Sequence, residues 1–151
     1  MPGGHTLIEL LTVFSILALV WLAFLPPAGR LQQSGLLFAT AATIASELKT
    51  GQKWAESFHG KEKIIFFKNP AGFWNYEKTR TFCDNSEKTS PGQNLPEKII
   101  FSSNFPGQTI TFNNSGNPQK AGQITLGLAG FNKQRNIVVS PVGRIRITDA
   151  F

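Results

Sequence analysis

The hydrophobic and polar positions divide the chain into three stretches. Residues 7–25 are almost uniformly apolar, and Glu9 is the only ionisable side chain among them. A helix of this length spans about 28 Å, close to the thickness of a bilayer core. Apolarity on every face of a helix is typical of a membrane span. We therefore expect residues 5–29 to form a transmembrane N-terminal helix.

The spacing of apolar residues becomes helical after the adjacent prolines Pro26 and Pro27. Each proline removes a backbone donor, so we expect a kink or local melting there. Residues 30–58 then show an amphipathic helical pattern. Its apolar face comprises Leu37, Ala41, Ile44, Leu48, Ala55 and Phe58. The polar positions that fall largely elsewhere include Thr40, Glu47, Lys49 and Lys53. The pattern predicts an upper helix whose apolar face packs under a sheet.

From residue 59 onward the chain consists of short runs rich in β-forming residues, bounded by Gly, Pro, Asn or Ser. Seven runs are predicted to be strands: Lys63–Lys68, Phe73–Tyr76, Ile99–Phe101, Thr109–Phe112, Ile124–Leu128, Ile137–Ser140 and Arg144–Thr148. Residues 84–96 are polar and rich in turn formers, and are expected to form an exposed loop. The expected fold class is α+β, with a long N-terminal helix packed on antiparallel β-sheet. Residues 59–151 would be its β-rich globular head.

Charge is distributed unevenly along the chain. All fifteen Lys and Arg residues lie from Arg30 onward, together with eight of the nine acids. Such an excess favours anionic partners, whether nucleic acid, anionic lipid or an acidic protein face. A generally basic, solvated surface explains the same composition. Charge alone therefore identifies no partner.

Motifs for catalysis and for metal or cofactor binding are missing from the sequence. His5 and His59 are the only histidines, and Cys83 is the only cysteine, so the chain cannot form an internal disulfide. The metalloprotease, dithiol, nucleophile-elbow and phosphate-loop patterns do not occur. We expect no enzymatic activity, no cofactor and no metal.

The N-terminal segment from Gly4 to Leu10, GHTLIEL, resembles the processing site of type IV prepilins and type II secretion pseudopilins. In that family a prepilin peptidase cuts after the glycine and methylates the new amino terminus. The resemblance implies a leader at residues 1–4, cleavage between Gly4 and His5, and Glu9 as the fifth mature residue. His5 stands where phenylalanine or methionine is usual. Pro26 falls where family members carry a helix-kinking proline.

The resemblance also gives the glutamate a role in assembly. A carboxylate inside a bilayer costs about 2.5–3.5 kcal/mol on insertion scales. In an assembled fibre, Glu9 of one subunit would pair with the free amino terminus of its neighbour and set the register. The protein would sit in the bacterial inner membrane as a single-pass protein, with its head outside the cytoplasm. The alternative is a simple single-span anchor whose Glu9 lies near the headgroups.

The C-terminal sequence Ser140-Pro141-Val142-Gly143 predicts a tight turn between two strands, with Gly143 free to adopt positive φ. On the following strand, the two-residue period places Arg144 and Arg146 about 6.6 Å apart on one face. The intervening isoleucines would then face the core. Exposed guanidinium groups held in this way suit phosphate oxygens.

The segment Val139–Arg146, VSPVGRIR, resembles the ending of GspH/FimT-type minor pilins and pseudopilins. In members active in natural transformation, a Gly-Arg-x-Arg motif is implicated in DNA binding. The resemblance makes Gly143, Arg144 and Arg146 the candidate motif, with Lys133 and Arg135 on the preceding loop as helpers. The alternative is structural: the arginines would pair with acids of an adjacent subunit or cover an edge strand.

The sequence therefore predicts a minor pilin or pseudopilin, a structural subunit assembled near the tip of a type IV pilus or type II secretion pseudopilus. Its expected partners are other pilins, prepilin peptidase and the inner membrane. The alternative function is non-sequence-specific DNA binding in DNA uptake and competence. The sequence does not distinguish a secretion machine, a pilus and a DNA-uptake machine.

Overall fold

The computed structural model describes residues 6–150, apart from the side chains of residues 23–28, 30 and 150. Internal contacts divide the chain into two compact units, residues 1–35 and 36–151. Helix α1 (Leu7–Ser57) contributes residues to both units. Its helical backbone continues through Pro26 and Pro27, so local melting at these prolines does not occur. The side chain of Pro26 lies outside the described residues.

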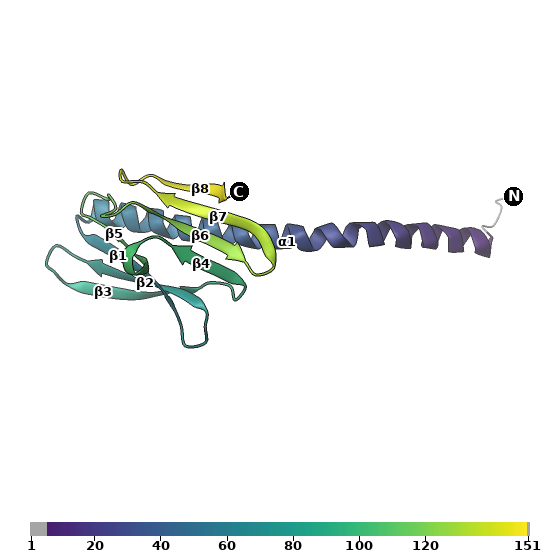
Figure 1. Ribbon diagram of the computed structural model, residues 1–151, viewed down its shortest axis with the longest axis horizontal. Coiled ribbons are helices and arrows are strands. Elements are labelled where there is room, and N and C mark those ends of the chain that lie inside the picture. The colour runs from purple at the N-terminus through teal and green to yellow at the C-terminus, as the bar shows by residue number, and fades with distance from the viewer. Residues whose placement is uncertain (1–5, 151) are drawn as a thin grey trace. The chain divides into compact units, whose positions relative to one another are not determined.

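The second unit contains two antiparallel four-stranded sheets (Figure 1). The first has the order β3-β2-β1-β5, with β1 (Lys61–Lys68), β2 (Trp74–Thr81), β3 (Glu87–Asn94) and β5 (Thr109–Phe112). The second has the order β4-β6-β7-β8, with β4 (Ile99–Ser103), β6 (Gly122–Leu128), β7 (Phe131–Val139) and β8 (Ile145–Ala150). A short 3₁₀ turn, η1 (Pro106–Gln108), precedes β5. The α+β class and the antiparallel packing predicted from the sequence are confirmed.

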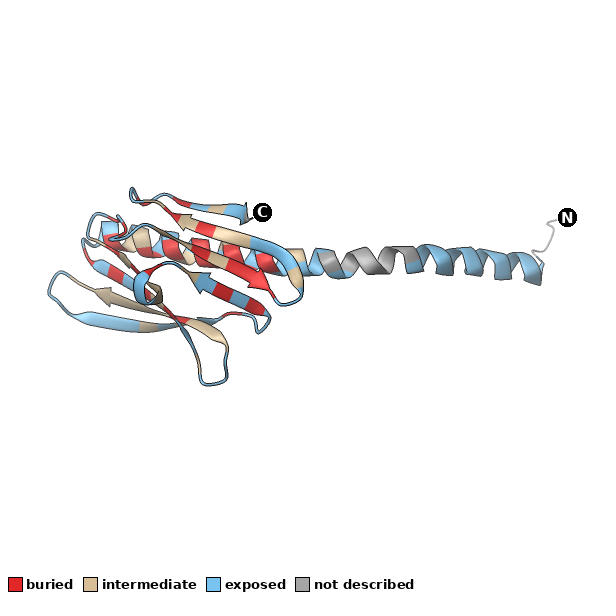
Figure 2. Cartoon of the chain, in the orientation of Figure 1, coloured by how far each residue is buried: buried red, intermediate tan, exposed pale blue. Residues whose placement is uncertain are grey.

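One hydrophobic core joins helix α1 to both sheets (Figure 2). Leu37, Ala41, Ile44, Leu48 and Ala55 are all buried, as the helical spacing predicts. The predicted exposure was wrong for two residues, Phe58 and Thr40. Phe58 is exposed and stacks on Trp54, because the helix ends at Ser57. Thr40 is buried, because its hydroxyl donates to the Leu36 carbonyl oxygen and needs no solvent.

The predicted loop over residues 84–96 is also wrong, because it contains strand β3. Its polar composition gives no strand signal, and only pairing with β2 fixes its conformation. Pro91 is tolerated because β3 is an edge strand of its sheet. Strands β2 and β7 are also longer than predicted, and the described residues contain eight strands rather than seven.

A buried carboxylate beneath α1 is paired with a half-buried arginine. The Glu62 side chain on β1 is 0% exposed, and Arg80 of β2 donates from Nε to its Oε2 at 2.9 Å. The other carboxylate oxygen, Oε1, has no hydrogen-bond partner among the described residues. A Cβ added to Gly51 of α1 would lie 2.6 Å from this Oε1. Gly51 therefore lets the helix backbone approach the carboxylate closely.

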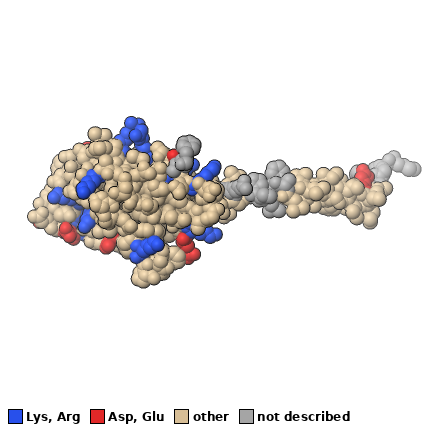
Figure 3. Space-filling model, in the orientation of Figure 1, with Lys and Arg blue, Asp and Glu red and all other residues tan. Residues whose placement is uncertain are grey.

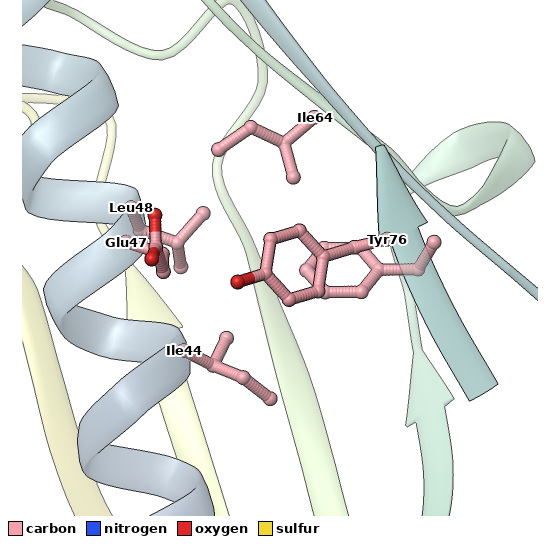
Figure 4. A pocket seen from close by; sticks show the side chains of 6 residues that line it. Ile44, Glu47, Leu48, Ile64 and Tyr76 are labelled. Carbon is pink, nitrogen blue, oxygen red and sulfur yellow. The ribbon is translucent and has the colours of Figure 1, made fainter. Parts of the chain in front are cut away.

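Tyr76, the only tyrosine, lies between β2 and α1 (Figure 4). Its ring packs among Ile44, Leu48 and Ile64, and its hydroxyl points toward α1, where Glu47 lies. Glu47 is itself paired with Lys78, with Nζ and Oε2 2.6 Å apart. Burial, and secondarily the negative charge of Glu47, raises the pKa of Tyr76.

We expect Gly51→Ala to destabilise the head. In an unobstructed helix, Gly to Ala stabilises by about 0.5–1 kcal/mol, but here the new methyl group meets a buried carboxylate. The expected change is a loss of about 1–3 kcal/mol in the free energy of unfolding. Thermal unfolding of the full chain in detergent micelles, followed by circular dichroism, measures it. Gly35→Ala is the control, because its Cβ would meet nothing within 4 Å. Equal melting temperatures for the two variants would contradict this prediction.

The ultraviolet titration of Tyr76 should have a higher midpoint in the folded than in the denatured protein, where the ordinary pKa is 10.0. As pH rises above this value, the unfolded tyrosine loses its proton while the folded one retains it. The raised pKa therefore makes the free energy of unfolding fall with pH in this range. Tyr76→Phe should remove this part of the pH dependence. Coincident midpoints for folded and denatured protein would refute it.

Candidate functional site

The C-terminal hairpin presents the residues predicted to bind DNA. Ser140 to Arg144 connect β7 to β8. The sequence predicts a turn here, but it assigns Ser140 and Arg144 to the flanking strands, whereas β7 ends at Val139 and β8 begins at Ile145. The Gly143 amide donates to the Ser140 carbonyl oxygen at 3.0 Å, and the Arg144 amide donates to Ser140 Oγ at 3.0 Å. Gly143 has a φ of 75°, the positive value predicted for it. These bonds fix the backbone from which Arg144 extends.

The turn is held against helix α1. Gly143 is buried, and a Cβ at this position would collide with the side-chain amide nitrogen of Gln52. The same Cβ would lie 3.3 Å from the Gly116 carbonyl oxygen. Glycine is therefore required both by the backbone conformation and by the lack of space. The contact between turn and helix fixes the start of β8.

The predicted alternation along β8 is confirmed. Ile145 is buried and Ile147 is half-buried, whereas Arg144 and Arg146 are exposed. Within residues 6–150, neither arginine takes part in an ion pair. Strand β8 is also an edge strand of its sheet. The two guanidinium groups are thus available to a partner.

The predicted helpers do not join this pair. Lys133 and Arg135 lie within β7, not on a loop, because β7 begins at Phe131. Arg135 forms an ion pair with Asp149, and its guanidinium lies 5.5 Å from the ring centroid of Phe38. Arg146 is the register partner of Val138, so the two-residue period places it on the opposite face from Arg135. The structure therefore separates the helpers from the arginine pair.

Two functional candidates on α1 were not predicted from the sequence. Lys49 and Lys53 line a surface hollow of about 500 Å³ together with Arg144. The remaining lining residues are neutral: Ser46, Thr50, Gln52, Gly143 and Ile145. The four-residue spacing of the lysines, which puts both on one exposed helix face, was the available signal in the sequence.

The basic side chains visible in Figure 3 are spread over several parts of the head surface.

The aromatic cluster that follows β1 belongs to the core. Tyr76 is buried, and Trp74 packs with its ring centroid 4.7 Å from that of Phe101. The ring of Phe66 packs against both Phe101 and Tyr76, with centroid distances of 4.8 Å and 5.9 Å respectively. These rings stabilise the packing of the two sheets. They are not arranged as an exposed platform for stacking bases.

The N-terminal half of α1 carries the residues predicted to direct processing and assembly. Gly4 and His5 lie outside the described residues. Glu9 is in the first turn, and its amide donates to the Thr6 carbonyl oxygen at 3.0 Å. The apolar side chains between Leu7 and Leu22 are 47–83% exposed, as their blue colour in Figure 2 shows. They occupy all sides of the helix, a pattern typical of helices that are covered by lipid or by other helices.

A search of the described residues for a helix with the length and apolarity needed to cross a membrane found none. Residues 23–25 of the expected span are among those whose side chains are not described.

Comparison with solved structures identifies the fold. FimU, a type IV minor pilin of Pseudomonas aeruginosa, aligns with a TM-score of 0.58 over 78% of this chain and 92% of its own, at 14% identity. A second crystal form of FimU gives a TM-score of 0.54 at 15% identity, covering 74% of this chain and 92% of FimU. The chain has the minor pilin fold.

The same fold occurs in EpsH, a minor pseudopilin from the type II secretion system of Vibrio cholerae. It aligns with a TM-score of 0.57 at 10% identity, over 75% of this chain and 96% of EpsH. No protein-family model and no curated sequence matches this chain. The similarity thus resides in the arrangement of helix and sheets, not in the side chains.

Proposed function

We propose that this protein is a minor pilin or pseudopilin, a structural subunit of a type IV pilus or a type II secretion pseudopilus. The observation that carries the proposal is the exposed apolar surface between Leu7 and Leu22 of α1, attached to a head with the minor pilin fold. A helix that is apolar on all sides is covered by lipid or by other helices. A filament subunit uses both in turn: lipid before assembly, and the helices of neighbouring subunits afterwards. This role is structural and requires no catalysis.

The processing and assembly steps follow from the N-terminal residues. Prepilin peptidase would cleave between Gly4 and His5 in the bacterial inner membrane and methylate the new amino terminus, leaving the head outside the cytoplasm. The released α-amino group ionises with a pKa of about 7.7–8.0. Glu9 of one subunit would pair with this group on its neighbour, so that both charges are neutralised inside the helix bundle. Pro26 would mark the bend of the assembled helix, and the subunit would lie near the filament tip.

Glu9→Ala is expected to abolish incorporation into the filament while leaving membrane insertion intact, because it removes the partner of the neighbouring amino terminus. Immunoblotting of sheared filaments and of membrane fractions from the native bacterium measures both quantities. Glu56→Ala is the matched control, since Glu56 is an exposed acid on the same helix. Incorporation of the Glu9 variant at the control level would rule out the register role.

DNA binding is the second candidate function. It is favoured by Arg144 and Arg146, which are exposed, lie outside any ion pair within residues 6–150 and extend from a hydrogen-bonded turn. Guanidinium groups bind phosphate oxygens through two parallel hydrogen bonds. Such contacts hold a nucleic-acid backbone but read no base sequence. A minor pilin with this property would serve DNA uptake and competence.

Arg144→Ala/Arg146→Ala is expected to weaken binding of a short labelled DNA duplex to the full chain in micelles. For every phosphate that an arginine no longer neutralises, the slope of log affinity against log salt should fall by about 1. Fluorescence anisotropy at several salt concentrations measures both effects. Lys61→Ala/Lys63→Ala is the control, because these exposed cations have the same two-residue spacing on β1. If both variants bind DNA equally well, the arginines have a structural role only.

A further inference from the structure

The hollow between α1 and the turn joining β7 to β8 gathers three cations. Lys49, Lys53 and Arg144 are exposed, and the ion pairs among residues 6–150 include none of them. Neither Asp nor Glu is among the residues that line the hollow. By contrast, Lys78 and Arg80 on β2 are each paired with a carboxylate. The hollow is therefore a concentration of positive charge at a concave surface.

The three cations are held in a fixed relation by the fold. Lys49 and Lys53 are one helical turn apart, about 6 Å along the axis of α1. Gln52, which also belongs to this part of α1, packs against Gly143 and so brings the turn onto the helix. Arg144 directly follows that glycine, and its amide is bonded to Ser140 Oγ. The site thus combines one rigid helix with one hydrogen-bonded turn.

We propose that this hollow is a binding site for the phosphate backbone of a nucleic acid, with Lys49, Lys53 and Arg144 each contacting phosphate oxygens. The inference rests on the second function proposed above and adds to it a site on the helix. Lysine supplies a compact charge that tolerates different approach directions, whereas Arg144 supplies a planar fork. The neutral lining leaves the phosphates without competition from protein carboxylates.

A linear polyanion suits this surface better than a single carboxylate. Arg146 does not line the hollow, but lies two residues beyond Arg144 on the exposed face of β8. Lys49, Lys53 and Arg144 thus present three cations at one hollow, and Arg146 lies outside it. A backbone with a phosphate on every nucleotide can engage several members of such a group at once. A lone acidic side chain would satisfy one of them.

The decisive experiment measures binding of a fluorescein-labelled DNA duplex to the full chain in micelles, at several salt concentrations. Lys49→Gln/Lys53→Gln should weaken binding about tenfold and reduce the salt slope by about 2. Lys49→Arg/Lys53→Arg should retain binding, because it preserves both charges. Lys61→Gln/Lys63→Gln, which changes the net charge equally on β1, should have little effect. Circular dichroism melting curves identify any variant that fails to fold.

The possible results distinguish failure of the proposed hollow from failure of DNA binding, the function on which the inference rests. If the arginine double variant loses binding while Lys49→Gln/Lys53→Gln does not, DNA binding stands but the hollow is not its site. Failure of the wild type to bind DNA overturns both. Competition by polyglutamate as strong as that by DNA would show that the hollow takes an acidic protein surface, and would overturn the phosphate assignment. Filament incorporation tests the structural role independently of all three results.

Discussion

The apolar face of α1 from Leu37 to Ala55 is the surface on which the head is organised. Both sheets bury their inner side chains against this face, so one helix contributes to a core that the two sheets share. The remaining contacts depend on this arrangement. It brings the backbone at Gly51 next to the Glu62 carboxylate, and it brings Gln52 next to the turn at Gly143. The basic hollow exists because the same helix also presents Lys49 and Lys53 to solvent.

The sequence predicts those features that repeat regularly or require a particular residue. The three- and four-residue spacing of Leu37, Ala41, Ile44 and Leu48 predicts the buried helix face, and the alternation after Gly143 predicts which of the following residues are exposed. Strand β3 could not be predicted in this way. Its polar residues have weak β-propensity, and its conformation is set by pairing with β2, which no local signal in the sequence indicates.

The candidate site was predictable only in part, because some of its residues are brought together by tertiary packing that local sequence does not indicate. Arg144 and Arg146 lie next to a turn that the sequence identifies, so their exposure could be inferred from local pattern. The contribution of Lys49 and Lys53 depends on the packing of a helix against a hairpin about ninety residues later in the chain. The pairing of Arg135 with Asp149 depends on the register between β7 and β8, which local sequence does not specify.

The composition of strand β3 affects how the head can meet other molecules. Edge strands with free backbone groups tend to pair between molecules and so lead to aggregation. In β3, Pro91 lacks a backbone donor, and Glu87 and Lys88 are exposed charges. Pairing of this edge with the sheet of another subunit is therefore disfavoured. The β3 side of the first sheet is thus protected against strand addition, whatever other surface of the molecule binds a partner.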